Sequence, residues 1–233
     1  MREHDDRLTL IELGDMGPRG VPEVFRPYEK PVRQIIEWAS AYLCRPHPDL
    51  GRKGNVCPFV HTSMSKGLFY LAVCPGIPGS VDEVAEVLRG YRDWFVELVA
   101  DQGRAAQYAT ILVLFPDLPE DAVVGVIDEA QSLLKADYVS RGLMIGEFHD
   151  GPPVKGGLWN PEFRPLCSPV PLLAVRHMVP TDFPFLKDDA GSLREYLRRH
   201  GRNLPPQAKG EAVEAAARLG LTTDFMEPRE EDC

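Results

Sequence analysis

The sequence predicts an α+β fold, a single domain whose sheet has roughly four strands, in the order strand, helix, strand, helix, strand, strand, with helices packed on it. Short apolar runs, typical of buried strands, alternate with segments in which apolar residues recur at helical spacing. Of the 233 residues, 44% are hydrophobic, which is enough for one sizeable core. The sequence contains no internal repeat or low-complexity linker that would separate domains.

A first helix is expected from Pro31 to the stretch RPHP at 45–48, because apolar residues recur at 32, 35, 36, 39, 42 and 43. The run LFYLAV (68–73) is expected to form the first strand. Ser80 and Glu83 have the spacing of a capping box and predict the start of a second helix, with apolar residues at 84, 87, 88, 91, 95 and 98.

The run ATILVLF (109–115) predicts a second strand, and Asp117 is expected to cap a third helix, whose apolar face holds residues 123, 124, 127, 130 and 134. The runs LMIGEF (143–148) and PLLAVRHM (171–178) predict two further strands. Helical segments are expected at 191–200 and 208–219. They complete the predicted order of elements.

Three segments are expected along the chain. Residues 1–29 lack a sustained period and have Gly or Pro at 17, 18, 20 and 22, so they predict an N-terminal arm. Residues 30–220 are expected to form the α+β domain, which carries the candidate site described below. Residues 221–233, which include MEPREEDC, predict an acidic C-terminal tail.

The charge and composition of the chain exclude some classes of binding partner. A net charge of −9 argues against nucleic acid and against an anionic membrane surface. A charged N-terminus without a secretory signal, and the lack of an apolar run of roughly 18 residues, predict a cytoplasmic protein. The five cysteines predict reduced thiols, since their number and spacing suggest neither a disulfide framework nor a zinc knuckle. Small molecules or other proteins remain as partners, and a homo-oligomer stays open.

The common catalytic motifs for nucleotides, serine hydrolysis and zinc proteolysis are absent from the sequence. A hydrolytic cysteine could still be built from Cys57 or Cys167 with His149 or His177. Burial of the cysteine as a small hydrophobic residue is the commoner outcome.

His149 is the most informative residue of the sequence. It follows the predicted strand 143–148, a rigid place from which to present a metal ligand or a base. Asp150 comes next, and its side chain or a nearby carbonyl could hold the other ring nitrogen. The alternative is that HDGP is only a turn with a solvated histidine.

The loop after His149 has the composition of a pocket for a flat ligand with an anionic edge. Trp159 and Phe163 would provide an apolar wall, while Asn160 and Arg164 would donate hydrogen bonds. Prolines at 161, 165, 169 and 171 stiffen the loop. Haem is such a ligand, with Arg164 and Arg176 as candidates for its propionates. The alternative is a surface loop packed on its own aromatic residues.

A second candidate segment is GRKGNVCPFVHTS (51–63). Cys57 precedes Pro58 and is therefore held extended, and such a thiolate can bind ferric haem. We expect Cys57, Pro58, Phe59 and His61 to line the pocket. His61, His177 and the Cys57 thiolate are alternatives to His149 as the iron ligand.

The order of these elements resembles the YqcI/YcgG family, whose studied members are haem-dependent oxygenases that hydroxylate nitrogen in guanidine groups such as that of arginine. The resemblance spans about residues 31–179. It rests on CPF (57–59), the strand LFYLAV, a helix, the strand TILVLF, a helix, FHDGPP (148–153), the NP turn at 160–161 and RPLCS (164–168). The order Cys-Pro-Phe replaces the Phe-Pro-Cys order of that family, and TDFPFLKDDAGSLREYL has no counterpart there.

The chain thus looks like a sister family of uncharacterised actinobacterial-type domains. The resemblance implies that His149 is the axial ligand of haem b iron. It also implies that Asn160, Pro161 and Arg164 shape the haem edge, while Cys57, Pro58 and Phe59 line the pocket.

The leading hypothesis is a haem-dependent oxygenase that oxidises a nitrogen-containing small molecule such as an amine or guanidine. It would take electrons from a donor such as a ferredoxin or flavoprotein. The first alternative is a non-catalytic haem carrier or sensor that uses the same histidine. The second is a cofactor-free thiol enzyme or interaction protein.

Overall fold

The computed structural model describes residues 1–4, 8–17, 21–154 and 160–224. These residues form two compact units. Unit 1 is made of residues 1–134 and 145–177, and unit 2 of residues 135–144 and 178 onward. In the part of the chain that the structure describes, no helix is both long enough and apolar enough to cross a membrane.

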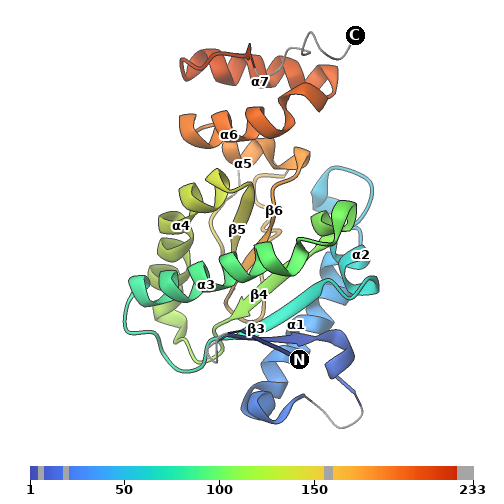
Figure 1. Ribbon diagram of the computed structural model, residues 1–233, viewed down its shortest axis with the longest axis vertical. Helices are drawn as coiled ribbons and strands as arrows, with labels where there is room; N and C mark the ends of the chain where they lie inside the picture. The colour runs from blue at the N-terminus through green and yellow to red at the C-terminus, as the bar shows by residue number, and fades with distance from the viewer. Residues whose placement is uncertain (5–7, 18–20, 155–159, 225–233) are drawn as a thin grey trace. The chain divides into compact units, whose positions relative to one another are not determined.

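Six strands of the described residues form one mixed sheet, in the order β1-β2-β3-β4-β6-β5 (Figure 1). β3 and β4 are parallel, whereas β2 pairs with β3, and β6 with β4, in antiparallel fashion. The α+β class is therefore confirmed, although the sheet has two more strands than the sequence predicts. The strands are β1 (Arg2–His4), β2 (Leu8–Glu12), β3 (Phe69–Val73), β4 (Thr110–Leu114), β5 (Leu143–Phe148) and β6 (Leu172–His177).

The two additional strands come from the segment expected to be an N-terminal arm. Leu10 and Ile11 of β2 are fully buried, and Arg2 of β1 donates to Glu12 of β2 at 2.6 Å. β1 has three residues and β2 has five, which is too short for a period-two pattern to stand out in the sequence.

The helices follow the predicted order. The α-helices are α1 (Glu29–Trp38), α2 (Val60–Ser65), α3 (Val81–Val99), α4 (Glu129–Ser140), α5 (Phe183–Leu186), α6 (Ala190–His200) and α7 (Pro206–Arg218). Two segments are π-helical, η3 (Ala39–Leu43) and η7 (Val124–Asp128). Short 3₁₀ helices lie at Leu13–Asp15, Glu23–Tyr28, Pro48–Leu50, Gly103–Tyr108, Glu120–Ala122, Pro180–Asp182 and Gly201–Asn203.

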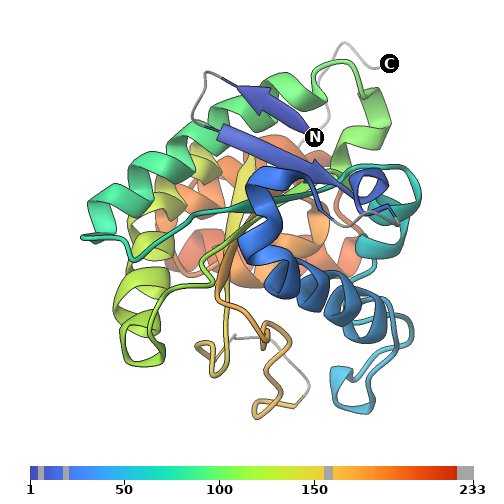
Figure 2. The ribbon, with the colours of Figure 1, turned by 90° about the horizontal axis from the view of Figure 1, so that it is seen from below.

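The central strands of unit 1 are covered on both faces, which is why they are apolar throughout. Phe69, Leu71 and Val73 of β3 share a buried cluster with Val32 and Ile35 of α1. The alternate residues of β3 point to the other face. Figures 1 and 2 show α3 on one side of the strands and α1 on the other.

The start of α3 is as predicted. Ser80 caps it, since its Oγ accepts from the N–H of Glu83 at 3.2 Å. The Glu83 carboxylate reaches back to the N–H of Gly79, at 2.8 Å. Together these contacts satisfy two backbone donors at the helix start.

The expected helix cap at Asp117 is wrong. α4 begins only at Glu129, after a 3₁₀ turn and the π-helical η7. Asp117 instead accepts from the N–H of Gly76 at 2.7 Å and from the hydroxyl of Tyr28 at 2.8 Å. The carboxylate therefore joins the segments that follow β3 and β4, a use that local sequence does not reveal.

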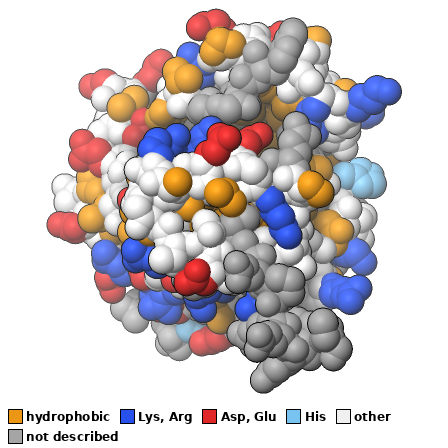
Figure 3. Space-filling view, turned by 90° about the horizontal axis from the view of Figure 1, so that it is seen from above, with side chains coloured by type: hydrophobic (Ala, Val, Ile, Leu, Met, Phe, Trp, Pro, Cys, Tyr) orange, Lys and Arg blue, Asp and Glu red, His pale blue; other side chains and the backbone are white. Residues whose placement is uncertain are grey.

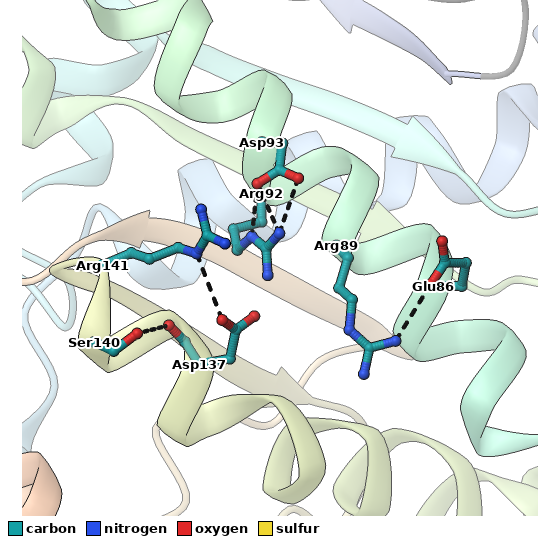
Figure 4. A network of polar contacts seen from close by, with 7 residues as sticks. All are labelled: Glu86, Arg89, Arg92, Asp93, Asp137, Ser140 and Arg141. Carbon is teal, nitrogen blue, oxygen red and sulfur yellow. Dashed lines mark hydrogen bonds and ion pairs between the residues drawn. The ribbon is translucent and has the colours of Figure 1, made fainter.

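α3 contains a buried charge. Arg92 is 6% exposed, and two of its nitrogens donate to the carboxylate of Asp93, both at 2.8 Å (Figure 4). One turn earlier, Arg89 reaches Glu86 at 3.3 Å. The Arg92 pair matters more, because a guanidinium withdrawn from water needs a counter-charge.

Unit 2 is a helical unit built around its own core. Its core comprises Val139, Met144, Met178, Phe183, Leu186, Leu193, Tyr196, Leu197, Leu204, Ala212, Ala215 and Ala216. The hydroxyl of Tyr196 donates to the carbonyl of Pro180 at 2.6 Å. Near the end of α4, Ser140 donates to the carbonyl of Asp137 at 2.7 Å (Figure 4). Unit 1 and unit 2 exchange chain within α4 and β5, so no linker composition marks their boundary.

Gly142 ends the turn after α4 with φ +75°, and a Cβ there would lie 2.5 Å from the guanidinium of Arg199. Arg199 in turn donates to the carbonyl of Ser140 at 3.2 Å. The glycine thus permits both the left-handed backbone and the close approach of the arginine that caps α4.

His200 ends α6 beside the ring of Tyr196, at 5.4 Å between ring centroids. Its Nε2 is buried and has no hydrogen-bond partner among the described residues. Burial lowers the pKa of His200, an effect that Arg199 reinforces and that Asp182 and the backbone of Met178 oppose.

We expect Gly142→Ala to lower the free energy of unfolding by about 1–2 kcal/mol, because alanine is strained at positive φ and displaces Arg199. Gly210→Ala is the matched control, since Gly210 lies inside α7 with open space around it. It should raise stability by about 0.5–1 kcal/mol. Urea denaturation of both variants checks this, and equal effects would contradict the role of Gly142.

We expect His200 to make the protein less stable in acid. Its folded pKa lies below the usual 6.5, so the unfolded chain takes up the proton first. Stability present above pH 6.5 is then lost as the pH falls towards the folded pKa. Urea denaturation at pH 7.5 and 5.5 should show a smaller loss in His200→Gln than in the parent. The exposed His61 provides the control His61→Gln, which should keep the parent's loss.

Candidate functional site

His149 lies directly after β5 and is fixed through its backbone. It forms an isolated parallel bridge with Cys167, and its carbonyl accepts from the N–H of Ser168 at 3.0 Å. The residue is 1% exposed. The solvated turn that was the alternative for HDGP therefore does not apply to the imidazole, although Asp150 itself is exposed.

Both nitrogens of the His149 ring face oxygen acceptors. Nε2 lies 3.0 Å from Oδ1 of Asp128, and Nδ1 lies 3.3 Å from the carbonyl oxygen of Asp150. The first distance is that of a good charge-assisted hydrogen bond, whereas the second exceeds the usual range for N–H···O. Asp128 is therefore the partner that orients the ring.

Asp128 is the residue of the candidate site that sequence reasoning missed. It lies 21 residues before His149 and is the last residue of the π-helical η7. π-Helical turns are rare and frequently occur at functional sites. No local motif links the two residues, and only the fold brings the carboxylate to the imidazole.

Cys167 lies beside the same backbone, and its thiol donates to Oδ1 of Asp150 at 3.7 Å. Burial raises the pKa of the Cys167 thiol, and the charge of Asp150 raises it further, while the backbone of Gly151 partly opposes this. A nucleophilic cysteine needs the opposite shift, because the thiolate is the reactive form. The environment of Cys167 thus disfavours a thiol enzyme based on this residue.

An aromatic cluster, defined as Trp38, Tyr42, His47, Phe148 and Phe163, lies next to this site. Trp38 contacts Tyr42 and Phe148, with ring centroids 6.0 Å and 5.9 Å apart. His47 stacks on Phe163 at 4.6 Å. Phe148 immediately precedes His149 in extended chain, so the cluster lies on the face of the sheet opposite to the His149 ring.

Tyr42 connects the aromatic cluster to the loop that carries Cys167. It lies in the π-helical η3, and its hydroxyl is 3.5 Å from the carbonyl of Arg164. Burial raises the pKa of Tyr42 to about 12, and the charge of Cys167 adds to the effect. The phenol therefore stays protonated at neutral pH and acts as a donor.

The predicted haem-edge residues shape the loop backbone. Oδ1 of Asn160 accepts from the N–H of Glu162 at 2.9 Å, which forms a turn around Pro161. Arg164 donates to the carbonyl of Pro161 at 2.7 Å. Trp159 lies outside the described residues. The guanidinium of Arg164 is half-buried in this turn and close to the aromatic cluster through Phe163.

The residues of the CPF segment lie in different surroundings. Cys57 is tied to the end of η3, because its N–H donates to the carbonyl of Leu43 at 2.9 Å. Phe59 packs against Tyr108, at 6.1 Å, just before β4 begins. Pro58 and His61 are exposed. Phe59 therefore lies near the amino end of β4 and contributes to a different neighbourhood from His149.

Arg176 and His177 lie at the other end of the sheet from His149. Arg176 pairs with Thr110 at the start of β4. The start of β6, by contrast, follows Cys167 and Ser168, which contact His149. A strand of this length separates the two ends by roughly 15 Å. The ring of His177 packs on Phe95 of α3, at 5.2 Å.

The contact with Asp128 suits a metal-bound histidine, but iron could reach the ring only if the residues that cover its other nitrogen move. A metal-bound histidine commonly donates its other N–H to a carboxylate, and Asp128 is so placed. Nδ1 is then the nitrogen left for iron, so the Asp150 carbonyl and the cover over the ring must move aside. Among the described residues, no three His, Cys, Asp or Glu side chains are grouped to hold a metal ion.

Comparison with known proteins identifies a family. A family model described as a domain of unknown function, DUF6875, matches residues 32–211. This span runs from within α1 to within α7, and therefore includes His149, Asp128 and the aromatic cluster. No curated protein and no solved structure matches the chain.

We expect Cys167 to react slowly with iodoacetamide at pH 7 in the folded protein, because its raised pKa leaves little thiolate. The rate should be several-fold below that of the same cysteine in the urea-unfolded chain, and it should rise steeply above pH 9. Time-resolved peptide mass spectrometry measures it. Labelling of folded Cys167 faster than in the unfolded chain would support the thiol enzyme instead.

Proposed function

The chain belongs to the DUF6875 family, and we propose that it is a haem-dependent oxygenase that oxidises a nitrogen-containing small molecule, such as an amine or a guanidine. His149 is the proposed protein ligand of haem b iron. The proposed reaction takes place in the cytoplasm and draws electrons from a ferredoxin or a flavoprotein.

The contact between Asp128 and His149 carries the proposal. The carboxylate lies 3.0 Å from Nε2, where a carboxylate commonly holds the second nitrogen of a metal-bound histidine. The interaction holds one ring orientation. A histidine buried to 99% with such a partner is more than a solvated turn residue.

The other residues of the site would help to bind haem and to exclude water. Haem, when bound, supplies a redox-active iron for reactions with dioxygen or peroxide. Trp38 and Phe148 provide apolar surface near the end of β5, on the face opposite to the His149 ring. The Tyr42 hydroxyl, protonated at neutral pH, lies 3.5 Å from the carbonyl of Arg164 in the loop that carries Cys167.

The charge of the chain is compatible with a cationic substrate. A net charge of −9 attracts amines and guanidines over long range. On the face seen in Figure 3, basic and acidic side chains are interspersed with isolated hydrophobic ones. The charge of that face therefore gives a general attraction for cations and does not by itself select a substrate.

The test is the visible spectrum of the protein expressed with a haem precursor, in ferric, dithionite-reduced and carbon monoxide-bound forms. We expect one haem per chain and a Soret band of the histidine type. His149→Ala should abolish haem retention. Asp128→Asn should keep the ligand but weaken haem affinity by about 10–100-fold, as loss of a second-shell carboxylate does.

His61→Ala is the matched control, because His61 is exposed on α2. This variant should bind haem as the parent does. A parent that retains no haem, or a His149→Ala variant with the parent's spectrum, overturns the assignment. Loss of haem in His61→Ala or His177→Ala would move the ligand to that residue.

The same sample separates oxygenase from haem carrier or sensor. The reduced haem protein of an oxygenase should consume dioxygen, and faster when amines or guanidines are added. A stable ferrous protein that is inert towards dioxygen would contradict the oxygenase while leaving His149 as the ligand.

A further inference from the structure

Two cysteines meet at the neck of the loop formed by residues 45–56. Cys44 follows the π-helical η3, and Cys57 lies where the loop returns to the body of unit 1. The N–H of Val56 donates to the carbonyl of Arg45 at 2.8 Å, and the N–H of Cys57 donates to the carbonyl of Leu43 at 2.9 Å. These two bonds lie on either side of Cys44 in the chain and tie it against Cys57.

The backbone geometry suits a disulfide. Pro46 and Asn55 form an antiparallel bridge just inside the neck. Cys44 and Cys57 lie two residues outward from this bridge, one on each segment. Residues opposed across antiparallel segments have Cα atoms about 4.5–5.5 Å apart. Disulfides join Cα atoms separated by about 4.4–6.8 Å, so the neck requires little backbone movement to close.

The two side chains also face the same surroundings. Both cysteines are half-buried and pack against the same apolar cluster of unit 1. Burial raises the pKa of the Cys44 thiol, and the neighbouring Cys57 thiol raises it further. Both are free thiols in this structure.

We propose that Cys44 and Cys57 are a reversible dithiol–disulfide pair that closes the neck of the 45–56 loop. The oxidant is a low-molecular-weight disulfide. One cysteine, as thiolate, attacks it and releases the first small thiol, and the second cysteine displaces the other. One S–S bond forms in the protein as one breaks in the reagent, and the two protons of the cysteines pass to the released thiols.

The pair has a structural consequence beyond the neck. His47 lies inside the loop and stacks on Phe163, which belongs to the segment between His149 and Cys167. Figure 2 shows the two loops on the same side of the molecule. Closing the neck restricts the loop that supports this stacking. The thiol pair does not depend on haem and stands whether or not His149 binds iron.

The experiment exposes the full-length protein to oxidised glutathione at pH 8 and follows it by intact mass and by peptide mapping without reduction. We expect the mass to fall by two hydrogen atoms, the number of free thiols to fall from five to three, and a single cross-linked peptide joining Cys44 to Cys57. Dithiothreitol should reverse all three changes.

Cys44→Ser and Cys57→Ser should each carry stable mixed glutathione adducts at the remaining cysteine, since no partner displaces the adduct. Cys74→Ser and Cys167→Ser are controls and should form the cross-link as the parent does. Persistent glutathione adducts on both cysteines of the parent, or cross-links that join other cysteines, would overturn the proposal. Haem retention, measured on the same samples, tests the haem assignment separately, because formation of the cross-link does not require bound haem.

Discussion

The parallel pairing of β3 with β4 is the constraint from which the rest of unit 1 follows. Parallel neighbours need a crossover, and α3 provides it while covering one face of the strands. The strands are apolar on both sides, so the opposite face must also be covered, and α1 with η3 does this. That helical segment ends in Trp38 and Tyr42, which meet Phe148 and the loop before Cys167. The aromatic cluster therefore results from the packing of α1 and η3 on the sheet.

The parts of the fold that could be predicted are those whose signals are local. The run at 143–148 forms a strand with the predicted bounds, because a mostly apolar segment lies between Gly142 and the turn-forming residues that follow His149. Ser80 begins α3 because its cap needs only the next three residues. Asp117 shows the limit of such reasoning. Its carboxylate serves Gly76 and Tyr28, which are distant in sequence, and the π-helical η7 delays α4.

Only one partner of the His149–Asp128 contact could be predicted from the sequence. The position of His149 directly after a strand is a local property of the sequence. Its partner Asp128 comes from another element, and a π-helical turn cannot be anticipated from apolar spacing. Arg176 shows what the sequence leaves open about distance. The sequence makes it a candidate, with Arg164, for the propionates of haem, and antiparallel pairing with β4 puts it at the far end of β6.

A shared contact links the two proposed sites of unit 1, the His149 site and the Cys44–Cys57 pair. His47 belongs to the loop closed by Cys44 and Cys57, and Phe163 belongs to the segment that returns from His149 to Cys167. A ligand on His149 needs the Asp150 backbone to move, and this segment begins there. If closing the neck favours one position of Phe163, it changes ligand affinity by some factor. Linkage then requires ligand binding to change the ease of thiol oxidation by the same factor. The stacking of His47 on Phe163 is the physical element through which each site would influence the other.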